Sequence, residues 1–99
     1  MSNNYLRNIE ESLGEFPILL EALNQFSYDM KLMIADSLQL SLGSHFVTWM
    51  NSHDNRFTLK NLFKTLKREI EDNQREGNGY LQISFTVSNN GFKIISRCD

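Results

Sequence analysis

The fold class is decided by residues 80–97, which read YLQISFTVSNNGFKIISR. Apolar and polar side chains alternate strictly over residues 80–88, and such alternation predicts a strand with one buried face and one solvated face. The four apolar positions of the predicted buried face are Leu81, Ile83, Phe85 and Val87.

A turn follows this strand. Asn90-Gly91 suits a two-residue type I′ turn, so the chain is expected to return over residues 92–97 as an antiparallel partner. In that register Val87 lies opposite Ile94 and the apolar face is continuous. A lone hairpin is marginally stable in water, so this face is expected to pack against the rest of the chain.

Upstream of the hairpin, apolar residues recur at helical spacing. Leu6, Ile9 and Leu13 predict a first helix. Pro17 suits the first turn of a second helix, because its missing N–H would have no partner there. The expected buried face of this second helix comprises Ile18, Leu19, Ala22, Leu23 and Phe26.

A third helix is predicted over residues 28–42, capped by Ser27 and ended by Gly43. Its apolar residues point in most directions, which is typical of a helix covered on several sides. Residues 44–52 fit both a helix and a strand, and we favour a helix. Residues 52–55 are a loop by composition.

The clearest helix is predicted over residues 59–73, with Thr58 as its cap and Gly77-Asn78-Gly79 as its end. The sequence therefore predicts a single α+β domain over residues 1–99. Its N-terminal part is a bundle of four to five helices, and its C-terminal part is an antiparallel β-hairpin packed on that bundle.

Composition agrees with one folded domain. The chain has 99 residues, of which 40% are apolar and 11% aromatic, and this is too apolar for a disordered chain. No signal peptide or membrane-spanning run is visible, and the lone Cys98 fits a reducing compartment. We therefore expect a cytoplasmic protein with no membrane partner.

Charge is distributed unevenly along the chain. Residues 1–54 hold seven acids and two bases, a net charge of −5, whereas residues 55–99 hold eight bases and five acids, a net charge of +3. The formal total of −2 hides this division. The two halves would attract different partners.

No motif for catalysis, metal binding or nucleotide binding is found. His45 and His53 stand eight residues apart with no further ligand at metal-binding spacing, and Cys98 follows no helix start that would activate a thiol. The carboxylates fall on solvated helix faces, whereas acid–base catalysis needs a cleft. We expect no enzyme activity, no cofactor and no metal.

Four bases of the predicted helix over residues 59–73 could follow a phosphate backbone. Four nearby acids offset them, and a pair such as Arg68 with Asp72 would make this a self-compensated, solvated face. Nucleic acid is therefore the less favoured partner. The four bases are Lys60, Lys64, Lys67 and Arg68.

The acidic half has no such compensation, because only Arg7 and Lys31 lie near its acids in the sequence. An uncompensated negative surface speeds encounter with a basic partner and favours it over others. Tyr5 and Trp49 are candidate aromatic anchors beside it. The acids proposed to contact the partner are Glu10, Glu11, Glu15, Glu21, Asp29 and Asp36.

Two features suggest a resemblance to a known family. They are these acids, between Glu10 and Asp36, and the order of helices followed by a hairpin. In general character it resembles the immunity proteins of bacterial contact-dependent growth inhibition systems. The positive charge of residues 55–99 departs from a uniformly acidic inhibitor. The resemblance implies a monomer that forms a heterodimer with the toxic domain of a cognate effector, commonly a nuclease, and covers or blocks its active site.

The resulting hypothesis is an inhibitor that occludes a basic toxin domain with its acidic helices. Two alternatives stand beside it: a small nucleic-acid-binding regulator that uses the basic face of residues 59–73, and a phage-encoded inhibitor whose acidic surface imitates nucleic acid. The sequence does not separate the two kinds of inhibitor.

Overall fold

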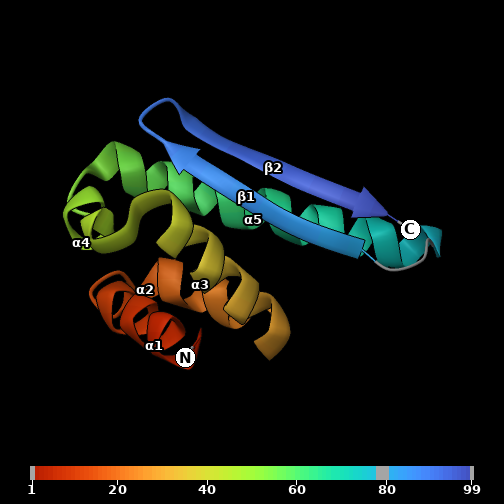
Figure 1. Ribbon diagram of the computed structural model, residues 1–99, viewed down its shortest axis with the longest axis horizontal. Coiled ribbons are helices and arrows are strands. Elements are labelled where there is room, and N and C mark those ends of the chain that lie inside the picture. Colours follow the sequence, from red (N-terminus) through yellow and green to blue (C-terminus); the bar gives the residue numbers. More distant parts are fainter. Residues whose placement is uncertain (1, 78–80, 99) are drawn as a thin grey trace.

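The computed structural model describes residues 2–77 and 81–98, and in them helices precede a β-hairpin (Figure 1). The predicted α+β class is confirmed. Asn78 and Gly79 of the predicted helix end, and Tyr80 at the predicted start of the strand, lie outside the described residues. The elements are α1 (Ser2–Leu13), α2 (Pro17–Asn24), α3 (Tyr28–Leu42), a 3₁₀ turn η1 (Gly43–His45), α4 (Phe46–Trp49), α5 (His53–Glu76), β1 (Leu81–Ser88) and β2 (Gly91–Cys98).

Most helix boundaries follow the predicted signals. Pro17 occupies the first turn of α2, and the side chain of Ser27 caps α3 by accepting a hydrogen bond from the N–H of Met30. Gly43 ends α3 and Gly77 ends α5, both with positive φ. Glycine favours these ends because a Cβ would be strained in that conformation.

The start of α5 differs from the prediction. Ser52, not Thr58, is the cap, and its hydroxyl accepts a hydrogen bond from the N–H of Asn55. Residues 53–55 are therefore helical rather than a loop. Thr58 instead donates to the carbonyl of Asp54 one turn earlier. The polar composition of this first turn concealed the helix, because solvent covers it and no apolar period marks it.

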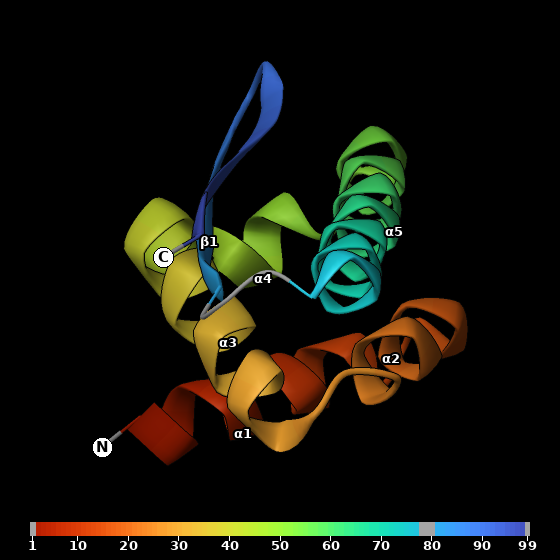
Figure 2. The same cartoon turned by 90° about the vertical axis from the view of Figure 1, so that its right-hand side faces the viewer.

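Helix α3 lies at the centre of the molecule (Figure 2). It packs against α1 on one side and against β1 on the other, as its apolar distribution predicted. Asp29 and Asp36, seven residues apart on its remaining stripe, are both exposed. The η1 turn and α4 follow, so the helical interpretation of residues 44–52 is also confirmed for most of that segment.

The hairpin pairs in a different register from the predicted one. Val87 lies opposite Phe92, and Ile94 lies opposite Phe85. The turn residues are Asn89 and Asn90 rather than Asn90 and Gly91. A type I′ turn needs positive φ at both central residues, and neither asparagine has it; Gly91 takes the positive φ, 123°, at the start of β2.

Because the shift is two residues, each side chain stays on its predicted face. Ile83, Phe85 and Val87 are buried, and they join the helices in one core. Ile18 is an exception to the predicted core, since it is 68% exposed whereas its neighbour Leu19 is buried. The buried helical residues include Leu6, Ile9, Leu13, Leu23, Ile34, Leu38, Leu59, Leu62, Phe63 and Leu66.

Candidate protein-binding site

The structure separates the acids that the sequence grouped. Glu11 on α1 and Glu15 just after it line one groove, together with Tyr5. Glu10 is half-buried beside them but does not line the groove. The remaining three acids are exposed on α2 or α3, away from this groove, and are Glu21, Asp29 and Asp36.

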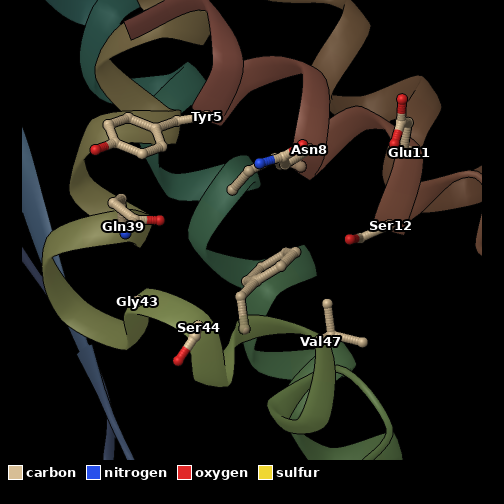
Figure 3. Close-up of a pocket in the computed structure, with 10 residues that line it drawn as sticks. Tyr5, Asn8, Glu11, Ser12, Gln39, Gly43, Ser44 and Val47 are labelled. Carbon is tan, nitrogen blue, oxygen red and sulfur yellow. The ribbon is translucent and has the colours of Figure 1, made fainter. Parts of the chain in front are cut away.

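The groove runs between α1 and the segment formed by the end of α3, η1 and α4. We call it the acidic groove. Figure 3 shows Asn8 and Ser12 of α1 facing Gln39 of α3 across the opening, with Glu11 at its edge. The cavity has a volume of about 550 Å³.

A second cavity of about 110 Å³ continues the acidic groove toward the end of α1. Glu11, Ser12 and Val47 line both cavities, and Glu15 and Asn51 line only the second one. Both carboxylates therefore border the two joined cavities from the α1 side.

Glu11 and Glu15 are four residues apart, and both side chains are exposed. Within residues 2–77 and 81–98, neither carboxylate has a lysine or arginine partner at ion-pair distance. With no cation at ion-pair distance, these two carboxylates leave the α1 edge of the groove negatively charged, and Glu15 also borders a cavity lined by Arg56 and Lys60. The acidic groove is thus complementary to a basic surface.

Apolar surface accompanies this charge. Tyr5 is 40% exposed and Val47, on α4, is 60% exposed. Tyr5 fits the predicted role of an exposed aromatic side chain. Val47 was not singled out from the sequence, because a valine next to Phe46 in an ambiguous segment reads as core.

Trp49 is not an exposed anchor. Its side chain is 8% exposed and its ring stacks on Phe46, with ring centres 6.4 Å apart. Its indole Nε1 is buried, and no acceptor for it is found among the described residues. The prediction that Trp49 contacts a partner is therefore wrong in this conformation, because Trp49 belongs to the core.

The ion pair predicted on the basic face of α5 is not formed. Asp72 pairs with Arg75, at 3.4 Å, and not with Arg68 as predicted. In the described part of the chain Lys60, Lys64 and Arg68 have no ion-pair partner.

The lysines border a second groove, between α2 and α5, which sequence reasoning missed. Phe57 could have indicated this groove, because it stands three residues before Lys60 and so lies on the same helix face. That inference requires knowing that the helix begins at His53.

The described residues show no metal site, since no group of three or more His, Cys, Asp or Glu side chains comes together among them. His45 and His53 are both exposed. None of the described helices is both long enough and apolar enough to span a bilayer.

Comparison of this chain with family models, with curated proteins and with solved structures finds no match.

Proposed function

We propose that this protein is an immunity-type inhibitor that binds a basic toxin domain through its acidic groove and neutralises it by occlusion. The observation that carries the proposal is the pair Glu11 and Glu15, which lack counter-ions among the described residues and line a groove next to exposed apolar side chains. A charged rim beside apolar contact area is the usual composition of a specific protein interface.

The exposed side chains of this groove have two different roles. Tyr5 and Val47 supply apolar area that a partner would remove from water, and the two glutamates select a basic partner and speed encounter. Glu21, Asp29 and Asp36 act only through the long-range field, because they lie outside the groove. Of the six acids, therefore, only Glu11 and Glu15 are proposed to contact the partner.

The test uses the product of the reading frame adjacent to the gene of this protein, expressed under an inducible promoter. Wild-type protein should restore growth when that product is toxic, and the double variant E11K/E15K should restore it poorly. E21K/D36K is the matched control, since it makes the same change in net charge outside the groove. A neighbouring product that is harmless, or equal protection by both double variants, would contradict the proposal.

A further inference from the structure

The groove between α2 and α5 has an apolar floor. One cavity, of about 360 Å³, is lined by Pro17, Ile18 and Phe57 among others, and a second, of about 260 Å³, lies next to it. Ile18 and Lys60 line both cavities, so the two form one continuous surface. We call this surface the apolar groove. The second cavity adds Ala22, Phe26 and Phe63 to its lining.

Two large side chains of this groove are largely in water. Ile18 is 68% exposed and Phe57 is 60% exposed, and both line the first cavity. Contiguous apolar side chains exposed in a groove mark a contact surface, because leaving them hydrated costs free energy that a partner would recover.

A stripe of positive charge follows the groove. Lys60, Lys64 and Lys67 stand at i, i+4 and i+7 on α5, so they lie on one face of the helix over about 10 Å. Of these, Lys67 donates a hydrogen bond to the neutral side chain of Gln25. Among the residues lining the two cavities, Glu15 at one end is the acid, against Arg56 and the three lysines.

We propose that the apolar groove binds an amphipathic helix of a partner protein, with acidic side chains beside its apolar stripe. A helix fits because the groove lies between two helices and its cations repeat at helical spacing, so carboxylates at the same spacing can meet them. Phosphate recognition alone would leave Ile18 and Phe57 without a role. The apolar groove meets the acidic groove at Glu15 and Phe16, which line a cavity of each, but its lysines favour a partner whose charge is opposite to that of the partner proposed for the acidic groove.

The probe is a synthetic helical peptide of about 15 residues, long enough to follow α5 from Phe57 to Lys67. It carries leucines at three- and four-residue spacing and glutamates beside them. A matched peptide has lysine in place of every glutamate, and a second has the same composition in scrambled order. Binding to the full chain is measured by fluorescence anisotropy at low and high salt. The acidic amphipathic peptide should bind, and the other two should not.

Two double variants locate the binding. I18S/F57S and K60E/K64E should each weaken binding of the acidic peptide by about tenfold or more, and only K60E/K64E should also reduce its salt dependence, since Arg56 and Lys67 remain. K93E/R97E is the matched charge control on β2, outside the groove, and should bind as wild type does. Circular dichroism confirms that each variant is folded; all four groove substitutions replace exposed side chains.

The proposal is overturned by any of four results. The acidic peptide shows no binding, the three peptides bind alike, a single-stranded oligonucleotide displaces the acidic peptide and binds the same lysines more tightly, or the groove is filled by a second copy in a concentration-dependent dimer. E11Q, which lies outside both cavities of the apolar groove, should leave peptide binding intact. Failure of the toxin-binding proposal is thereby distinguished from failure of this one.

Discussion

The backbone N–H of Val87 donates a 3.1 Å hydrogen bond to the hydroxyl of Ser41, which joins the edge of β1 to the end of α3. The edge of a two-stranded sheet leaves backbone groups without partners, and an unpaired group that is partly buried destabilises the fold. Ser41 thus adds a directional contact to the apolar packing of β1 on α3.

Replacing Ser41 with alanine should lower the free energy of unfolding by about 1–2 kcal/mol, because the N–H of Val87 loses its acceptor. Urea unfolding followed by circular dichroism measures this. Ser84→Ala, on the exposed face of β1, is the matched control and should change stability little. Equal effects of the two substitutions would mean that the Ser41 contact contributes nothing specific.

The register of the hairpin is open to direct test. Because the N–H of Val87 points to Ser41, Val87 and Phe92 form a non-hydrogen-bonded pair, in which the Cα atoms approach to about 4.5 Å. A strong nuclear Overhauser effect is therefore expected between their Hα protons. The same signal between Ser88 and Lys93 would instead support the register with Asn90-Gly91 as turn residues, because these two residues would then form the non-hydrogen-bonded pair next to the turn.

Arg56 is expected to stabilise the start of α5. Its Nη1 donates a 2.8 Å hydrogen bond to the carbonyl of Met50, and its guanidinium carbon lies 4.6 Å from the centre of the Phe16 ring. Arg56→Ala removes both contacts and should cost about 1.5–3 kcal/mol of unfolding free energy.

The control for Arg56 is Arg75→Ala, which removes an exposed arginine paired with Asp72. Exposed ion pairs contribute about 0–1 kcal/mol, so this change should be small in thermal or urea unfolding. The cost of Arg56→Lys in unfolding free energy should fall between those of Arg56→Ala and Arg75→Ala, because lysine keeps the charge but lacks the planar donor group. A cost for Arg56→Ala no larger than for Arg75→Ala would contradict the assigned role.

Substitutions of Trp49 test whether its side chain belongs to the hydrophobic core. Trp49→Ala should cost about 3–5 kcal/mol, as for a large buried aromatic side chain. Trp49→Phe should cost much less, because it keeps the ring on Phe46 and removes an indole N–H that has no acceptor among the described residues. Urea unfolding by circular dichroism measures both. Small costs for both variants would mean that Trp49 is not part of the core in solution.

The sequence predicts those parts of this fold that depend on local periodicity. Alternation over residues 81–88 identified the buried face of β1, and the spacing of Leu59, Leu62 and Leu66 identified the buried face of α5. Glycine at positions 43 and 77 located two helix ends, since positive φ is a local requirement.

Features that depend on how the helices pack together could not be predicted from local periodicity. The exposure of Ile18 depends on where α5 crosses α2, and the burial of Trp49 depends on how α4 turns after η1. The division of the acids into groove and non-groove residues likewise depends on helix orientation. Arg68 looked compensated because Asp72 follows it by four residues, but Asp72 pairs with Arg75 instead.

The central claim, that the acidic groove binds a basic toxin domain, is tested most directly by calorimetric titration of that domain into three proteins at low and high salt. The proteins are wild type, E11Q/E15Q, and E21Q/D36N, which removes the same amount of charge outside the groove. We expect E11Q/E15Q to bind about tenfold more weakly and with less salt dependence, and E21Q/D36N to bind nearly as wild type does. Equal affinities of the two double variants would contradict the claim.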